Sequence, residues 1–168
     1  AQLQDIKALA DVVLDTSSMR TNTLKSRLRR AFSELAEQQL MDVSVFSFGF
    51  KNGLPVEADL MIDVRFLPNP PELRPLTGLD EPVAQFVIQH GITKKFLKSW
   101  FELLDVVMPG YVQEGKSLLS IAVGCTGGQH RSVAIARATA EHLTSQGYRV
   151  TLFHRDLEAA QKKSQQAE

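Results

Sequence analysis

The sequence lacks several features that would place it in a class of protein at once. It holds one cysteine, Cys125, so no disulfide can form within the chain, and a reducing, cytoplasmic setting is the simplest interpretation. No apolar run is long enough to span a bilayer, so we expect no membrane contact. Basic and acidic residues number 19 each and cancel. Because the whole chain then provides no attractive field, nucleic acid could be bound only by a local basic patch.

What the sequence does contain is a pattern of strands and helices. Hydrophobic residues make up 43% of the chain, which is typical of a globular protein. β-branched, aromatic or apolar runs predict strands, and apolar residues at spacings of three and four predict helices. The predicted strands are 43–48, 59–65, 118–123 and 149–154, and the predicted helices start at Asp80 as cap, span about 93–107 and span about 131–145. This order favours an α/β fold, with a mainly parallel sheet flanked by helices and an N-terminal helical extension.

That extension, residues 1–40, is expected to hold a short helix, a short strand at 12–15 and a basic helix from Thr23. Because the chain begins with Ala1 inside a helical pattern, we expect it to be a piece of a longer protein. Arginines gather on the basic helix without an acid between them, and the candidate RNA contacts are Arg27, Arg29 and Arg30. A solvated helix face explains the same cluster equally well, and contact with an acidic surface of the rest of a longer protein is a further alternative.

A glycine-rich loop at residues 124–132 follows the predicted buried strand 118–123 and leads into a helix. The first N–H groups of a helix lack partners and the helix dipole is positive there, so this position attracts anions. Gly127 and Gly128 let the backbone fold closely around an anion, and Arg131 can hold two phosphate oxygens. Further donors are offered by Thr126, His130 and Ser132. We therefore expect a phosphate-bearing ligand at this loop.

Two other interpretations of the loop stay open. It can be a plain connector between strand and helix, with Arg131 in solvent. Alternatively, the Cys-x5-Arg spacing from Cys125 to Arg131, followed by Ser132, matches the protein-tyrosine-phosphatase pattern, in which a thiolate attacks phosphorus. The helix dipole and Arg131 would then lower the pKa of Cys125, and Asp63 and Asp105 are the plausible acids. Cys125 can equally be a small packed thiol at the strand end.

Polar residues also follow the second predicted strand, just before a proline-rich turn. They are Asp63, Arg65 and Asn69. A fixed carboxylate beside a phosphate loop suits a ligand that carries an amine or a hydroxyl, with Asp63 binding that group and the loop binding the phosphate. A local salt bridge between Asp63 and Arg65, with no ligand role, is the alternative.

Five motifs occur in an order that goes beyond a generic anion site. They lie at residues 46–51, 63–70, 76–80, 124–133 and 154–158. Together they resemble the C-terminal domain of the RapZ/YvcJ family of bacterial nucleotide-binding proteins, and residues 41–158 carry the resemblance. Residues 10–17 are similar to the end of that family's N-terminal domain. We therefore expect residues 1–40 to be the end of that domain or a linker, 41–158 the C-terminal ligand-binding domain and 159–168 a polar tail.

The resemblance implies a sensing domain that is not itself an enzyme. Family members pair an N-terminal P-loop domain, which binds ATP or GTP, with this C-terminal domain. No Gly-x-x-x-x-Gly-Lys-[Ser/Thr] motif occurs here, so no cofactor is expected on this chain, and weak ATPase or GTPase activity is expected only of the full-length protein. One branch is similar to an adaptor that senses glucosamine-6-phosphate, with a small regulatory RNA and an RNase as partners. Assembly of the chain into a homo-oligomer is a further possibility that the sequence leaves open.

The resemblance also carries individual positions over to this chain. For the sugar phosphate these are Asp63, Cys125, Thr126, Gly127, His130 and Arg131. With the residues that the loop and the strand exit indicate, the predicted ligand-binding set is Asp63, Arg65, Asn69, Cys125, Thr126, Gly127, Gly128, Gln129, His130, Arg131 and Ser132. No metal site is predicted. Catalytic residues are predicted only if the chain is a phosphatase, and they are then Cys125, Arg131 and Asp63.

Overall fold

The computed structural model of the chain describes residues 41–69, 72 and 76–157, together with residues 7, 9, 10, 12–21, 23, 24, 27 and 28. The chain divides into two compact units, Ala1–Gln39 and Leu40–Glu168. In the first unit the prediction of a short strand at 12–15 is wrong, since these residues form neither strand nor helix. A β-branched run this short becomes a strand only when a neighbouring strand pairs with it. The predicted tail at 159–168 lies outside the described residues.

The second unit alternates strands and helices and is an α/β fold. Its elements are β1 (Asp42–Gly49), the 3-10 helix η1 (Phe50–Asn52), β2 (Leu60–Asp63), α3 (Glu81–Gln89), α4 (Gly91–Gln113), β3 (Leu118–Cys125), α5 (Arg131–Ser145) and β4 (Arg149–His154). The four predicted strands are confirmed, and so is the helix predicted at 131–145. Helix α3 begins as expected, with Asp80 at its N-cap position and proline in its first turn.

The strands form one parallel sheet in the order β2-β3-β1-β4. Because the strands run in the same direction, their carboxyl ends share one edge of the sheet. That edge carries Gly49, Asp63, Cys125 and His154. Strand β3 is interior to the sheet, and it is buried from Ile121 to its end, as its apolar sequence predicts. Ligands of open α/β sheets bind outside the carboxyl edge, where the glycine loop follows β3.

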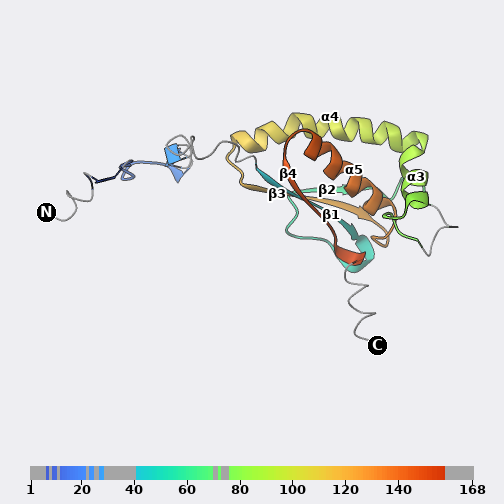
Figure 1. The fold of residues 1–168 in the computed structure, drawn as a ribbon. Coiled ribbons are helices and arrows are strands. Elements are labelled where there is room, and N and C mark those ends of the chain that lie inside the picture. The colour runs from blue at the N-terminus through green and yellow to red at the C-terminus, as the bar shows by residue number, and fades with distance from the viewer. Residues whose placement is uncertain are drawn as a thin grey trace. The chain divides into compact units, whose positions relative to one another are not determined.

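The two faces of the sheet are covered differently. Helices α3, α4 and α5 lie on one side of it (Figure 1), and α5 packs against β1, β3 and β4. Val45 points into the aliphatic core on this side. The other face carries the buried aromatic pair Phe46 and Phe48, against which Phe50 and Ala58 from the β1–β2 connection pack. The same connection brings η1 next to the carboxyl edge.

Helix α4 spans Gly91–Gln113 and is longer than the predicted 93–107. Pro109 and Gly110, expected to end or kink the helix, lie inside it. Proline removes one backbone donor from the helical ladder. On either side of it, however, Met108 is buried and Tyr111 packs against the core. Trp100 Nε1 also donates to Thr139 Oγ1 at 3.1 Å and ties α4 to α5. Tertiary packing of the helix face therefore outweighs one lost hydrogen bond.

Candidate functional site

The loop between β3 and α5, residues 126–130, rests directly on the end of β1. Gly128 has a φ of +75°, in the left-handed region that favours glycine. A Cβ on Gly128 would lie 2.7 Å from the Gly49 backbone nitrogen, and a Cβ on Gly49 would lie 2.5 Å from the Gly127 carbonyl carbon. Both distances are too short for real contacts, so no side chain fits between the two backbones. The loop shape thus depends on glycine at both positions.

Backbone N–H groups that have no partner among the described residues gather in this loop. Within the described part of the chain, no residue accepts a hydrogen bond from the N–H groups of Gly127, Gln129, His130 and Arg131. Helix α5 begins at Arg131, so the positive end of its dipole lies at the same place. Donors left unpaired at a helix start are the groups that anion oxygens satisfy.

Arg131 connects the loop to the turn that follows β2. Its Nη1 donates to the backbone oxygen of Arg65 at 2.6 Å and to that of Leu67 at 3.1 Å. Its Nη2 donates to Thr126 Oγ1 at 3.4 Å, inside the loop. The Nε atom is buried and has no hydrogen-bond partner among the described residues. Arg131 is therefore not a solvent-exposed residue of a plain connector, but a cation fixed between two segments.

Residues 76–78 close another side of the loop. His130 Nε2 lies 2.8 Å from the Leu76 carbonyl oxygen, and because a carbonyl only accepts, Nε2 carries the hydrogen. The Gly78 N–H donates to the Gln129 oxygen at 2.7 Å. A Cβ on Gly78 would lie 2.3 Å from the His130 oxygen, so this approach also requires glycine. Through these contacts residues 76–78, at the start of the Thr77–Asp80 region, pack directly against the loop.

Cys125, the last residue of β3, is buried against the loop with 3% of its surface exposed. Its Sγ lies 3.1 Å from Ser132 Oγ and accepts a hydrogen bond from the Gly128 N–H at 3.3 Å. Burial raises the pKa of the thiol, but the hydrogen bonds from Ser132 and Gly128 and the charge of Arg131 outweigh burial. The pKa of Cys125 is therefore lower than its ordinary value. The residue is a packed thiol whose anionic form is stabilised.

Asp63 and Arg65 form an ion pair at the end of β2. Arg65 Nη2 lies 2.6 Å from Asp63 Oδ2, and Arg65 Nε also binds this carboxylate. The guanidinium of Arg65 lies over the Phe50 ring, 4.1 Å from its centroid. Hydrogen bonds from Arg65 lower the pKa of Asp63 although burial opposes them, and the charge of Arg131 contributes. Asn69 is exposed and makes no hydrogen bond to another described residue.

Two charged residues at this edge were not among the predicted site residues. The Lys51 N–H donates to the Thr126 oxygen at 3.2 Å, and Lys51 Nζ lies 3.7 Å from the position that a Cβ on Gly127 would occupy. Asp156 Oδ2 accepts from the Gly49 N–H, and the Asp156 side chain is only 9% exposed. Both residues belong to the motifs at 46–51 and 154–158, and that membership was the signal available in the sequence.

Two other predicted residues take different places. Asp105, offered as an acid for phosphatase chemistry, lies 2.7 Å from His142 Nε2 in the last turn of α5. The loop is at the opposite end of that helix, so Asp105 is wrong as a general acid. Of the candidate RNA contacts, Arg27 is exposed, whereas Arg29 and Arg30 lie outside the described residues.

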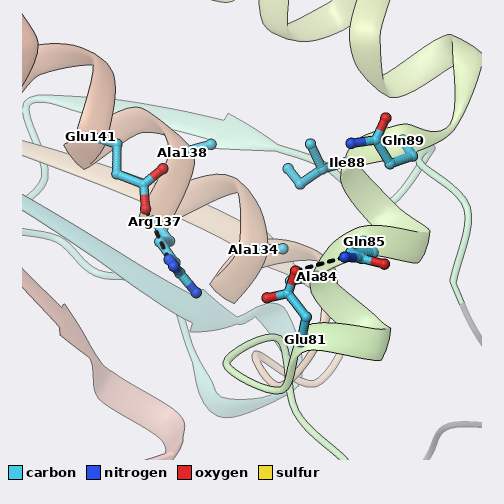
Figure 2. Close-up of a pocket in the computed structure, with 9 residues that line it drawn as sticks. All are labelled: Glu81, Ala84, Gln85, Ile88, Gln89, Ala134, Arg137, Ala138 and Glu141. Carbon is cyan, nitrogen blue, oxygen red and sulfur yellow. Dashed lines mark hydrogen bonds and ion pairs between the residues drawn. The ribbon is translucent and has the colours of Figure 1, made fainter.

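A groove of about 220 Å³ lies between α3 and α5 and is separate from the loop. Figure 2 shows its lining, where Arg137 binds Glu141 and Gln85 binds Glu81 on the same helix. These polar groups satisfy one another, and among the described residues that line the groove the one cation, Arg137, is paired. We therefore place the candidate ligand site at the loop.

Some classes of site are not found in the part of the chain that the structure describes. There, no group of three or more His, Cys, Asp or Glu side chains is arranged to hold a metal ion. No helix in the same part is both long and apolar enough to cross a membrane.

Comparison with known proteins identifies the family. The RapZ C-terminal domain family matches residues 41–158. Three curated relatives are each named nucleotide-binding protein. The one from Limosilactobacillus reuteri (strain DSM 20016) is 49% identical over 159 residues, which is 93% of this chain and 54% of the relative. Those from Caldicellulosiruptor saccharolyticus and Carboxydothermus hydrogenoformans are each 46% identical, over 94% and 93% of this chain and 55% of each relative.

The present chain thus spans about half the length of the curated relatives that it matches. The family match covers all the residues that meet at the carboxyl edge of the sheet, from Gly49 to Asp156. The resemblance read from five sequence motifs is confirmed, and the chain belongs to the RapZ C-terminal domain family.

Proposed function

We propose that residues 41–158 form a ligand-sensing and partner-binding domain that takes a phosphorylated small molecule at the loop 124–132. The observation that carries the proposal is the set of unpartnered N–H groups at the start of α5, next to the fixed cation Arg131. Phosphate oxygens would accept from these groups. The buried Nε of Arg131 also lacks a partner among the described residues, and a ligand oxygen would satisfy it.

An amino-sugar phosphate such as glucosamine-6-phosphate fits the rest of the edge. Asp63 stands where β2 ends, paired in register with Gly124 on the neighbouring strand, and its side chain is 43% exposed. Its lowered pKa keeps it ionised, so it can accept hydrogen bonds from an amine or a hydroxyl. Under this proposal the loop binds the phosphate, and Asp63 recognises the amine.

The direct test is calorimetric titration of glucosamine-6-phosphate into the wild type and Arg131→Ala. We expect the variant to bind about tenfold or more weakly, because hydrogen bonds to charged groups contribute about 1.5–3 kcal/mol. Arg137→Ala is the matched control, since it removes the same charge from an exposed position of α5. Equal affinities of the wild type and Arg131→Ala would place the ligand elsewhere.

A second candidate function is a Cys-dependent phosphatase, favoured by the contacts of Cys125 with Ser132 and Gly128. In that reaction the thiolate would attack phosphorus, the alcohol would leave with a proton, and water would hydrolyse the cysteinyl phosphate. This reaction needs an acid that protonates the leaving group, whereas hydrogen bonds from Arg65 lower the pKa of Asp63 and keep it ionised, so that it has no proton to give. Turnover of p-nitrophenyl phosphate that disappears in Cys125→Ser would favour the phosphatase over the sensing domain.

We further propose two properties of the whole protein. The relatives are named nucleotide-binding proteins, and no P-loop motif occurs in this chain, so an ATP or GTP site would lie outside it. Small regulatory RNA would be contacted by the basic segment around Arg27, through its phosphates. Equilibrium binding of ATP and GTP to this chain alone tests the first property, because binding here would contradict it.

A further inference from the structure

Positive charge exceeds negative charge around the glycine loop. Arg65 is paired with Asp63, and Arg155 is paired with Asp156. Among the described residues, neither Arg131 nor Lys51 has a carboxylate within ion-pair distance. Arg131 is bound by backbone oxygens instead, which keep its charge in place without cancelling it.

A further carboxylate, that of Asp80, follows the 76–78 segment and is held by uncharged groups of Thr77. Asp80 Oδ2 accepts from the Thr77 N–H at 2.7 Å and from Thr77 Oγ1 at 3.0 Å. The side chain therefore points back to Thr77 and makes no cap hydrogen bond to α3. Among the described residues, Arg131 and Lys51 thus remain without an acidic partner.

These two cations flank the loop from different segments. Arg131 approaches on the Thr126 side, where Nη2 lies 3.4 Å from Oγ1. Lys51 approaches from η1, and its Cε and Nζ lie 3.6 and 3.7 Å from the position of a Cβ on Gly127. The backbone of Lys51 is fixed to the loop by its N–H bond to the Thr126 oxygen. Its ammonium therefore lies beside the loop on an exposed side chain whose backbone is fixed.

We propose that Lys51 sets the charge of the ligand, so that the loop selects dianionic phosphate monoesters over monoanions of the same shape. This inference rests on the proposed function and extends it to the chemical class of the ligand. One anionic charge is compensated by Arg131, and the second by Lys51. A phosphate monoester carries close to two negative charges above its second pKa of about 6, whereas a sulfate ester carries one.

The residue type suits this role. The lysine ammonium acts as a mobile point charge, whereas the arginine fork fixes direction. Selection by Lys51 should thus depend on charge more than on hydrogen-bond geometry. Lys51→Arg is expected to keep the preference for a dianion, and Lys51→Gln is expected to lose it. Because the side chain is exposed, neither change should prevent folding.

The test compares glucosamine-6-phosphate with glucosamine-6-sulfate by calorimetry at pH 8, using wild type, Lys51→Gln, Lys51→Arg and Lys116→Gln. Lys116 precedes β3, at the end of that strand opposite the loop, and Lys116→Gln removes the same charge from a partly exposed pair with Asp59. We expect the wild type to prefer the phosphate about tenfold, or about 1.4 kcal/mol. Lys51→Gln should reduce that ratio to about two- or threefold, and Lys116→Gln should leave it unchanged.

Three other outcomes of these titrations would contradict the proposed role of Lys51, each in a different way. A wild type that binds both esters equally overturns selection by charge and leaves the proposed phosphate loop intact. Equal weakening of both esters in Lys51→Gln shows general attraction without selection. If the wild type binds neither ester, both the inference and the proposed function fail. Thermal melting of each variant confirms that binding is compared between folded proteins.

Discussion

The guanidinium of Arg131 donates from Nη1 to the backbone oxygen of Arg65 at 2.6 Å. The first residue of α5 thus holds the turn that follows β2, 66 positions earlier in the chain. The same side chain reaches into the loop through Nη2 and Thr126 Oγ1. Arg131 is therefore a structural connection as well as a candidate ligand contact, and its removal has two separable consequences.

Arg131→Ala should destabilise the protein in the absence of any ligand. The Arg65 and Leu67 carbonyls would lose a charged donor, and such hydrogen bonds contribute about 1.5–3 kcal/mol. Urea unfolding measures the loss in the free energy of unfolding. Arg137→Ala, which breaks only an exposed pair with Glu141, should cost less than about 1 kcal/mol. Equal losses in the two variants would contradict a structural role for Arg131.

Ser132→Ala should raise the pKa of the Cys125 thiol, because the thiolate would lose its closest hydrogen-bond donor. The pH dependence of thiolate ultraviolet absorbance measures this pKa, and the signal is unambiguous since the chain has one cysteine. Cys125→Ser provides the blank. An unchanged pKa in Ser132→Ala would mean that Ser132 does not stabilise the thiolate.

The same shift predicts how stability depends on pH. The folded-state pKa of Cys125 is lowered from its ordinary value of 9.0. Its contribution to stability is therefore fully present above 9.0 and lost as pH falls through the folded-state pKa. Across that window the wild type should gain more stability with rising pH than Ser132→Ala does, as urea unfolding at several pH values would measure. Parallel pH profiles for the two proteins would contradict this linkage.

Gly128→Ala should be more destabilising than Gly53→Ala, although both glycines have positive φ, 75° and 92°. A Cβ on Gly53 meets nothing within 4 Å, so only backbone strain of about 1–3 kcal/mol is expected there. A Cβ on Gly128 would also collide with the Gly49 nitrogen and Asp156 Oδ2, and overpacking of this kind adds about 1–3 kcal/mol. Urea unfolding compares the two, and equal stabilities would contradict the close approach of loop and β1.

The triple change of Arg27, Arg29 and Arg30 to Ala should weaken retention of a small regulatory RNA on a filter. Each lost phosphate contact should make the slope of log binding constant against log salt concentration shallower by about 0.7–0.9. A triple change of Lys94, Lys95 and Lys98 to Ala removes the same charge from α4 and should have less effect. Unchanged RNA retention in the arginine variant would remove this segment from the RNA surface.

Local sequence was sufficient for the elements that carry the loop. The apolar run of β3 predicts the strand before the loop, and the change from glycines to a helical pattern at Arg131 predicts the helix after it. Both predictions succeed because a buried strand and a helix start are marked by residues that are close together in the sequence. The Asp63–Arg65 pair was also foreseeable, since two residues of opposite charge stand two positions apart at a strand end.

The remaining features depend on contacts that are distant in sequence. The Arg131 bonds to Arg65 and Leu67 and the approach of Lys51 to Gly127 arise only when strand ends meet at one edge. The continuation of α4 past Pro109 reflects core packing, which overrides the local preference of proline. Such effects have no periodic pattern that the sequence alone displays.

The side-chain-free contact between Gly49 and Gly128 also affects how motion spreads through the domain. No side chain fits between the two backbones, so no rotatable group is there to absorb a displacement of the loop. We expect a ligand that draws the loop inward to shift the Gly49 N–H, from which Asp156 Oδ2 accepts a hydrogen bond. We therefore expect occupancy of the loop to reach the residues that follow β4 through Gly49 and Asp156, without a shift of any helix.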